Sequence, residues 1–172
     1  MSSNCICYFA YGSNLLAKRM HLLNPNAVRY GKAILKDYSL TFGGYASFWG
    51  GSPADIKHKV GHNVWGALWE IKLDDLSNLD EQEGVHENFY YPLSVEIETS
   101  NGTKLKCRTY QQVQRFEYIN LTKLPDVRKP SKSYLNTIIK GAEETGLPTD
   151  YLHFLKAIPT NDSEIIPEFL KC

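Results

Sequence analysis

The sequence Tyr-Phe-Ala-Tyr-Gly-Ser-Asn, at residues 8–14, marks the point where a strand gives way to a helix. Residues 5–11 are apolar and aromatic, so they predict a buried strand. Gly12 interrupts this pattern, and residues 15–23 predict a short helix with one apolar face. A strand that stops at a glycine and opens onto a helix leaves backbone N–H groups without partners, and such turns attract carboxylates and phosphates. The chain is therefore expected to begin with an anion-binding turn.

The turn by itself also has a simpler interpretation, because many strand–glycine–helix turns only redirect the chain. Ser13 or Asn14 is expected to cap the helix through its side chain. The second glycine and the Lys-Ser/Thr pair of a phosphate loop are absent, and so is the Gly-x-Ser-x-Gly pattern of a hydrolase nucleophile. From these residues alone, a structural role is favoured over a binding role.

Length and composition exclude several classes of protein. The 172 residues predict one domain, residues 1–172, with a substantial core. The 19 basic and 19 acidic residues cancel, so no net charge attracts nucleic acid or an anionic membrane. No apolar run reaches the ~20 residues that a membrane-spanning helix needs, and the N-terminus lacks a signal-peptide pattern. We therefore expect a cytoplasmic protein that binds neither nucleic acid nor membranes.

The cysteine pattern does not predict a metal site. Cys5 and Cys7 are not at metal-ligand or redox spacing, and they are expected to fill core positions of the first strand. Cys107 and Cys172 have no paired spacing, and a cytosolic location predicts that all four thiols stay reduced.

Strand patterns precede most of the helix patterns. Residues 113–129 have no clear period and predict a long connection with some strand. Because strands and helices are segregated in this way, we expect an α+β domain built on an antiparallel or partly closed sheet. Gly66 lies inside one strand pattern and indicates a bulge or a close backbone approach. The strands are expected at residues 30–42, 64–71, 90–98 and 103–111, with a hairpin turn at Asn101-Gly102 between the last two. The helices are expected at 74–83, 131–145 and 149–158. Ser131 is expected to cap the second of them, and Gly146-Leu147-Pro148 to end it.

A cluster of carboxylates is the second chemical feature. Asp80 and Glu83 are three residues apart and share a helix face, whereas Glu81 points elsewhere. A solvated acidic surface is the simpler interpretation. However, Glu83 falls at the end of the predicted helix, where the helix dipole disfavours negative charge, and Tyr90 and Tyr91 follow closely. A raised pKa of Glu83 would suit a general acid/base.

These motifs together resemble the gamma-glutamylcyclotransferase family. The resemblance runs in order from about residue 8 to residue 158, and its first and third motifs together are highly specific. Related enzymes that act on glutathione carry Gly-Tyr-Gly-Ser-Leu, and those that act on gamma-glutamylamines carry Tyr-Gly-Thr-Leu. The Tyr-Gly-Ser-Asn of this chain points instead to gamma-glutamyl amino acids. The motifs are Tyr-Phe-Ala-Tyr-Gly-Ser-Asn-Leu at 8–15, Val-Trp-Gly-x-x-Trp at 64–69, Leu-Asp-Glu-Gln-Glu-Gly-Val at 79–85, and Gly-Ala-Glu-Glu-Thr-Gly-Leu-Pro at 141–148 with the preceding Tyr134.

The resemblance implies a small α+β fold around a β-barrel, flanked by helices, with no metal and no cofactor. It implies an enzyme, a lyase or acyltransferase, in which the α-amine of a gamma-glutamyl group attacks its own γ-amide carbonyl. The products are 5-oxoproline and a free amino acid, and the partner is a small gamma-glutamyl dipeptide. The resemblance also suggests a homodimer, which the sequence itself does not determine.

The family's functional residues map onto positions of this chain. Glu83, the second glutamate of Glu-Gln-Glu, corresponds to the catalytic acid/base. An α-amine with a pKa of roughly 8 is mostly protonated at neutral pH, so a positioned carboxylate must take its proton and later return one to the leaving amine. The resemblance implies that the substrate is bound by Tyr8, Phe9, Ala10, Tyr11, Gly12, Ser13, Tyr90 and Tyr134.

The chain departs from the family pattern in two places. Residues 51–56 read Gly-Ser-Pro-Ala-Asp-Ile where the family often has Gly-Gly-x-Ala-Thr-Ile, so the effect of Ser52 and Pro53 on the pocket is open. Residues 86–89, His-Glu-Asn-Phe, add bulk and charge beside Glu83 and are expected to influence the choice of leaving group.

Two alternative functions remain at this stage. One is a cyclotransferase specific for glutathione or for gamma-glutamylamines. The other is a non-catalytic module of the same fold that binds a small acidic ligand. Glu83 counts against the second, because such a module would not place another carboxylate in its pocket.

Overall fold

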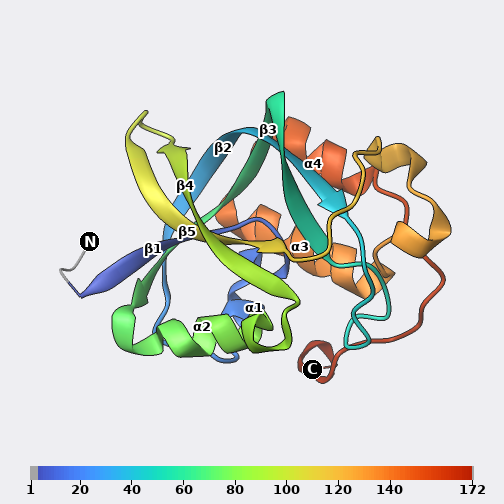
Figure 1. Cartoon of the computed structure of the whole chain (residues 1–172), viewed down its shortest axis with the longest axis horizontal. Coiled ribbons are helices and arrows are strands. Elements are labelled where there is room, and N and C mark those ends of the chain that lie inside the picture. The colour runs from blue at the N-terminus through green and yellow to red at the C-terminus, as the bar shows by residue number, and fades with distance from the viewer. Residues whose placement is uncertain (1–3, 172) are drawn as a thin grey trace.

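The computed structural model describes residues 4–171, which form a closed five-stranded β-barrel with helices around it (Figure 1). Neighbouring strands run in the order β1-β3-β2-β4-β5. They are antiparallel except where β1 meets β5 in parallel and closes the barrel. The predicted α+β class with a barrel flanked by helices is confirmed. The strands are β1 (Cys5–Ala10), β2 (Val28–Phe42), β3 (Ala54–Lys72), β4 (Tyr90–Thr99) and β5 (Lys104–Gln112).

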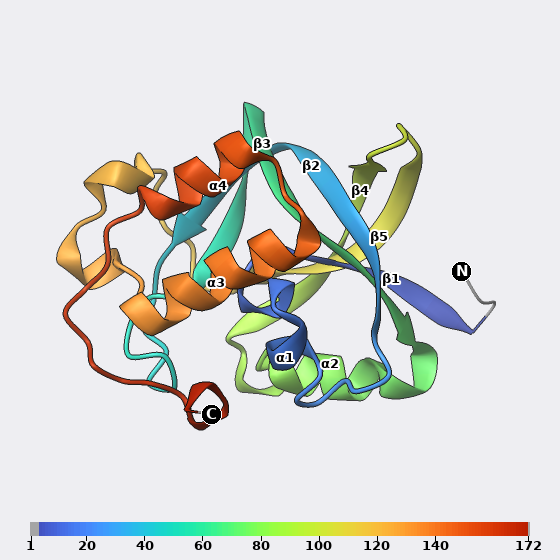
Figure 2. The same ribbon diagram turned by 180° about the vertical axis from the view of Figure 1, so that it is seen from behind.

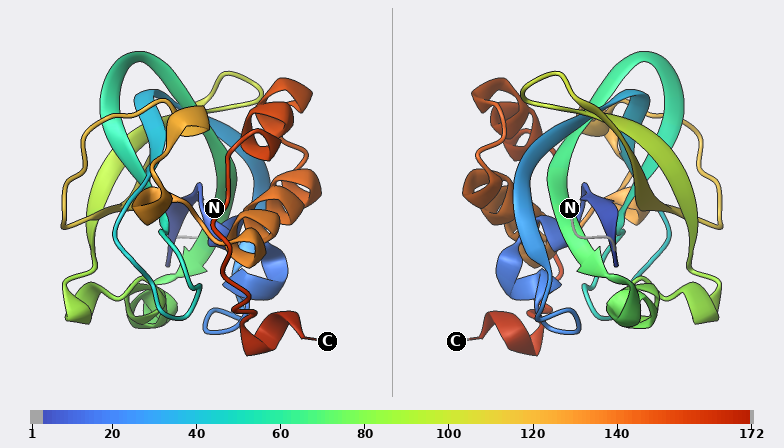
Figure 3. Two further views of the ribbon diagram at one scale, coloured as in Figure 1. Left: turned by 90° about the vertical axis from the view of Figure 1, so that its right-hand side faces the viewer. Right: turned by 90° about the vertical axis from the view of Figure 1, so that its left-hand side faces the viewer.

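The helices cover one side and one end of the barrel. Figure 2 shows α3 and α4 lying together against its side, with α1 and α2 together below it. Figure 3 shows the C-terminal segment running down past α3 toward α1. Among residues 4–171, no helix is both long enough and apolar enough to span a membrane. The helices are α1 (Ala17–Met20), α2 (Leu76–Gln82), α3 (Lys132–Thr145) and α4 (Thr149–Lys156).

Strand β3 is longer than its sequence pattern predicts. The apolar run at 64–71 lies in its second half, and that half crosses β1 so closely that a Cβ on Gly66 would lie 2.4 Å from the Ala10 carbonyl oxygen. This confirms the predicted close approach. The sequence does not predict the first half because residues 57–63 are mostly polar and at least partly exposed. They form a strand because they pair with residues 36–39 of β2.

Two further predictions about local structure are wrong. The expected helix at 15–23 is reduced to a 3₁₀ turn at Ser13–Leu15 followed by the short α1, and neither Ser13 nor Asn14 caps it by a side-chain hydrogen bond. The Asn14 side chain is instead hydrogen-bonded to Gln82 through its oxygen and to Glu83 through its nitrogen. Residues 113–129 contain no strand. They are attached to the barrel by the Arg128 guanidinium, which donates to the carbonyl oxygens of Phe42 at 2.7 Å and Glu117 at 2.9 Å.

The cysteines are thiols wherever the structure describes them. Cys107 is buried. Cys7 is partly buried and packs against the core, whereas Cys5 is partly buried and lies outside the core cluster, so the expectation of a core position is wrong for Cys5. The expectation for Cys172 lies outside the described residues.

Helix α3 begins and ends as its sequence predicts. The Ser131 hydroxyl accepts the N–H of Tyr134 at 3.2 Å, and Gly146 ends the helix in the left-handed region with φ 71°. Between them, Gly141 lets the helix touch the turn after β1: a Cβ there would lie 2.3 Å from backbone atoms of Leu15 and Leu16. This contact fixes the position of the turn that carries Asn14.

We predict that Gly141→Ala destabilises the protein although alanine is the better helix former. The added methyl group must push α3 away from the 3₁₀ turn, and overpacking of this kind costs about 1–3 kcal/mol. The expected result is a lower midpoint in urea unfolding. Lys140→Ala, at an exposed position of the same helix, is the control and should leave the midpoint nearly unchanged. A Gly141→Ala protein as stable as the wild type would show that this close contact is absent.

Candidate active site

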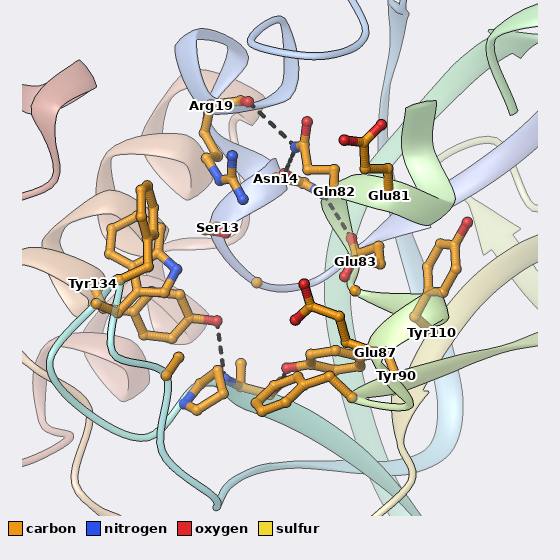
Figure 4. Close-up of a pocket in the computed structure, with 18 of the residues that line it drawn as sticks. Ser13, Asn14, Arg19, Glu81, Gln82, Glu83, Glu87, Tyr90, Tyr110 and Tyr134 are labelled. Atoms are coloured by element: carbon orange, nitrogen blue, oxygen red, sulfur yellow. Dashed lines mark hydrogen bonds between the residues drawn. The ribbon is translucent and has the colours of Figure 1, made fainter. Parts of the chain in front are cut away.

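A cavity of about 590 Å³ lies where β1 runs into the turn at 12–14 (Figure 4). Its walls come from segments far apart in the chain. They are the end of β1 and the turn, α1, residues 45–49 and 53–54, the end of α2 with the loop that follows it, and single residues from β5 and α3. The cavity therefore exists only because the barrel brings these segments together.

The Glu83 carboxylate is held from one side only. Its Oε1 accepts hydrogen bonds from the Tyr8 hydroxyl at 2.9 Å and from the Asn14 amide nitrogen at 2.7 Å. Asn14 is fixed in turn, because the Gln82 amide donates to its side-chain oxygen at 2.5 Å and the Trp69 indole donates to its backbone oxygen at 3.1 Å. The described residues offer no donor to Glu83 Oε2, which leaves that oxygen available to a ligand.

The environment of Glu83 raises its pKa above the ordinary value. The largest cause is burial, which disfavours the charged form, while the hydrogen bonds from Tyr8 and Asn14 and the positive charge of Arg19 oppose it. The predicted direction is therefore found, but its main cause is loss of solvent, not the helix dipole.

The three neighbouring carboxylates have separate environments. Asp80 forms an ion pair with the Arg108 guanidinium at 2.6 Å and accepts the Tyr110 hydroxyl at 2.5 Å. Glu81 is exposed at the rim of the cavity. Of these three, Glu83 is the one that presents an unpaired oxygen to the interior, so it is the one suited to proton transfer.

Two tyrosines frame the opposite wall. The Tyr134 hydroxyl accepts the backbone N–H of Ala54 at 2.9 Å. Since a hydroxyl has two acceptor sites and one donor, its own hydrogen is left to donate to a ligand. The Tyr90 hydroxyl instead donates to the Ala54 carbonyl. The backbone of Ala54 thus holds both tyrosines, and Ala54 lies in the segment 51–56 where neighbouring residues depart from the family pattern.

Most of the predicted site residues lie around the cavity. Phe9 and Ala10 do not line it: both are buried in the barrel packing, where the Phe9 ring lies against Gly66. Among the described residues, no cluster of His, Cys, Asp and Glu has the geometry of a metal site. The predicted residues that line the cavity are Tyr8, Tyr11, Gly12, Ser13, Glu83, Tyr90 and Tyr134.

Sequence reasoning missed three contributors to the site. Asn14 was expected to cap a helix, and nothing local shows that it meets a carboxylate 69 positions away. Gln82 reads as an ordinary exposed helix residue. Arg19 follows a second cation, Lys18, on a short helix, so the sequence gives no local signal that one of the two faces a cavity.

Comparison with known proteins identifies the family. The model of the AIG2-like family matches residues 63–155. The gamma-glutamylcyclotransferase of Bos taurus is 40% identical over 173 residues, which cover 95% of this chain and 87% of the bovine protein. The chain belongs to the gamma-glutamylcyclotransferase family. The Homo sapiens gamma-glutamylcyclotransferase is 39% identical over the same shares of both chains.

Solved structures agree with this family. A gamma-glutamyl cyclotransferase structure superposes with a TM-score of 0.84 at 38% identity, over 93% of this chain and 91% of the other. A yeast gamma-glutamyl cyclotransferase specific to glutathione shares the fold, with a TM-score of 0.58, but only 11% of the sequence.

We predict that Tyr8→Phe raises the pKa of Glu83 further. The change removes a hydrogen bond to the carboxylate, and losing a donor to the charged form favours the protonated form. The measurement is a carboxyl-carbon NMR titration, in which the Glu83 signal should titrate at higher pH. Tyr11→Phe is the matched control, because the Tyr11 hydroxyl donates to the Tyr110 carbonyl at 2.7 Å and not to a carboxylate. An unchanged or lowered Glu83 pKa in Tyr8→Phe would contradict the described hydrogen bond.

Proposed function

We propose that the chain converts gamma-glutamyl amino acids into 5-oxoproline and the free amino acid, with Glu83 as the general acid/base. The observation that carries this proposal is the Glu83 carboxylate itself. One of its oxygens is fixed by Tyr8 and Asn14, and the other faces a cavity large enough for a dipeptide. Membership of the family supports the reaction class.

The proposed reaction is an intramolecular acyl transfer in two proton-coupled steps. Glu83 Oε2 removes a proton from the substrate α-ammonium, and the free amine attacks the γ-carbonyl carbon to form a C–N bond. Glu83 then returns the proton to the amide nitrogen, and the original C–N bond breaks. The nitrogen of the new ring still carries a second proton, which passes through Glu83 to the departing amine. The lactam is then neutral, and the amino acid leaves as its ammonium form. The raised pKa of Glu83 brings it closer to that of the amine and of the leaving nitrogen, which favours transfer in both directions.

The turn at 12–14 and Tyr134 are proposed to hold the substrate. The first N–H groups of the 3₁₀ turn have no partner within it and suit the glutamyl carboxylate. The Tyr134 hydroxyl has a hydrogen left to donate to the γ-carbonyl oxygen as negative charge develops there. Holding the chain folded, with the amine facing the carbonyl, contributes through proximity.

The side of the leaving amino acid is proposed to lie toward residues 86–89. Glu87 and Phe89 line the cavity after the end of α2, and Glu87 is exposed. Figure 4 shows the Glu87 carboxylate turned into the cavity. A leaving amino acid with an acidic side chain would meet the negative charge of Glu87 there.

The alternatives use the same pocket differently. A preference for glutathione or for gamma-glutamylamines would change only the leaving group. A binding module for an acidic ligand would have no use for the open oxygen of Glu83. A cytoplasmic location and a homodimer stay predictions.

Measuring 5-oxoproline released from gamma-glutamyl-alanine, glutathione and gamma-glutamyl-lysine separates the three functions, and we expect release from the alanine compound.

Glu83→Gln should abolish most turnover while the protein stays folded. The amide keeps an acceptor for Tyr8 and Asn14 but cannot take a proton, and losing a general acid/base costs about 10²–10⁴-fold in rate. The measurement is kcat for gamma-glutamyl-alanine, with urea unfolding to verify the fold. Glu81→Gln, two residues away at the exposed rim, is the control and should remain active. Near wild-type turnover by Glu83→Gln would rule out the proposed mechanism.

Substrate variants test the attack of the amine and the role of Glu87 separately. N-acetyl-gamma-glutamyl-alanine should give no 5-oxoproline. The electron pair of its nitrogen is delocalised into the acetyl carbonyl and cannot attack the γ-carbonyl carbon. Gamma-glutamyl-glutamate should react more slowly than gamma-glutamyl-alanine, and Glu87→Gln should narrow that difference. Turnover of the acetylated compound would exclude amine attack. Equal rates for the alanine and glutamate compounds in the wild type would show that Glu87 does not repel an acidic leaving group.

A further inference from the structure

Arg19 is a cation in the cavity wall whose guanidinium has no ion-pair or hydrogen-bond partner in the described part of the chain. Its Nε is buried and has no hydrogen-bond partner in residues 4–171. No carboxylate of these residues lies within ion-pair distance of its guanidinium. A buried guanidinium ordinarily forms a two-pronged hydrogen bond with a carboxylate or phosphate, and leaving it without one is costly. The side chain is therefore built to receive an anion from outside the chain.

Aromatic rings hold Arg19 in place without satisfying it. Its guanidinium carbon lies 5.5 Å from the ring centre of Phe48, 6.0 Å from Trp49 and 5.9 Å from Phe169. Aromatic faces attract the positive charge but accept no strong hydrogen bond. The backbone is fixed as well, since the Gln82 amide donates to the Arg19 carbonyl at 3.3 Å. Arg19 is thus oriented before any ligand arrives.

Arg19 and Glu83 mark two different ends of the cavity. Tyr8 and Asn14, which hold Glu83, are only 4% and 5% exposed. The Phe48 ring beside Arg19 is 49% exposed. Figure 4 shows the Arg19 guanidinium and the Glu83 carboxylate turned toward the same space from different segments. The cation therefore faces the cavity from α1 and the exposed Phe48 ring, and the acid/base faces it from the end of α2.

We propose that Arg19 binds the carboxylate of the leaving amino acid and so selects gamma-glutamyl amino acids over gamma-glutamylamines. This inference rests on the proposed function. The substrate has two carboxylates, and the glutamyl one is next to the amine that must reach Glu83. The carboxylate of the leaving amino acid lies beyond the amide that breaks, away from the amine. The Arg19 guanidinium faces the same cavity and has no ion-pair partner among residues 4–171. An amine leaving group has no carboxylate to offer it.

The contact is expected to act on binding more than on the chemical step. The leaving carboxylate keeps its charge throughout the reaction, so Arg19 would hold the ground state and the transition state about equally. Such uniform binding changes KM with little effect on kcat. This separates Arg19 from Glu83, whose loss lowers kcat.

The test compares gamma-glutamyl-alanine with gamma-glutamyl-alaninamide, which lacks only the carboxylate. The wild type should favour the acid by about 10- to 100-fold in kcat/KM, the range of a charge-assisted hydrogen bond. Arg19→Met should lose this preference through a higher KM for the acid, with the amide changed little. Arg19→Lys keeps the positive charge but loses the two-pronged hydrogen bonding of the guanidinium. Its preference for the acid should therefore lie between those of the wild type and Arg19→Met. Lys18→Met, at the exposed neighbouring position of α1, is the matched control.

Each outcome decides the proposal. A wild type that treats the acid and the amide alike overturns it, whatever the stability of the variants. Equal losses on both substrates in Arg19→Met and Arg19→Lys also overturn it, and would place Arg19 on the glutamyl carboxylate while the proposed function stands. If the wild type releases no 5-oxoproline from either compound, the proposed function fails and the inference with it. The proposal is supported if Arg19→Met loses the preference for the acid over the amide while Lys18→Met keeps it.

Discussion

The hydrogen bond from the Asn14 amide to Glu83 joins the two halves of the site. Asn14 stands in the turn that ends β1, and Glu83 follows the last residue of α2, 69 positions later. The bond sets where the carboxylate lies and which of its oxygens is left open. Three further contacts fix the orientation of Asn14. Gln82 donates to its side-chain oxygen and Trp69 to its backbone oxygen, and the close contact of Gly141 with Leu15 and Leu16 fixes the position of the turn.

Short helix α2 assigns opposite environments to two carboxylates three residues apart. Asp80 is neutralised by Arg108 and Tyr110, so its charge is compensated and it cannot reach a ligand. Glu83 lies where the helix has ended, partly buried and bonded on one oxygen only. The left-handed Gly84, with φ 65°, turns the chain away directly after it. One turn of helix thus separates a structural ion pair from a group that can exchange protons.

The parts that the sequence predicts are those with local causes. The hairpin at Asn101-Gly102, the Ser131 cap and the end of α3 at Gly146 each follow from one or two residues whose backbone preferences leave little choice. The polar half of β3 is a strand only because β2 pairs with it. Asn14 leaves its expected capping role because its side-chain oxygen accepts the Gln82 amide, while its nitrogen donates to Glu83. The role of Arg19 depends on three aromatic rings, two of which come from residues 48–49 and one from near the C-terminus. Such contacts exist only after the barrel has closed.

The most direct test of this account is a crystal structure with an unreactive gamma-glutamyl analogue bound in the cavity. The analogue must keep the free α-amine and the α-carboxylate of the glutamyl unit. The account predicts the amine within hydrogen-bond distance of Glu83 Oε2, and the glutamyl carboxylate or the γ-carbonyl oxygen on backbone N–H groups of the turn at 12–14. An analogue whose amine lies away from Glu83, with no polar contact to residues 8–14, would contradict it.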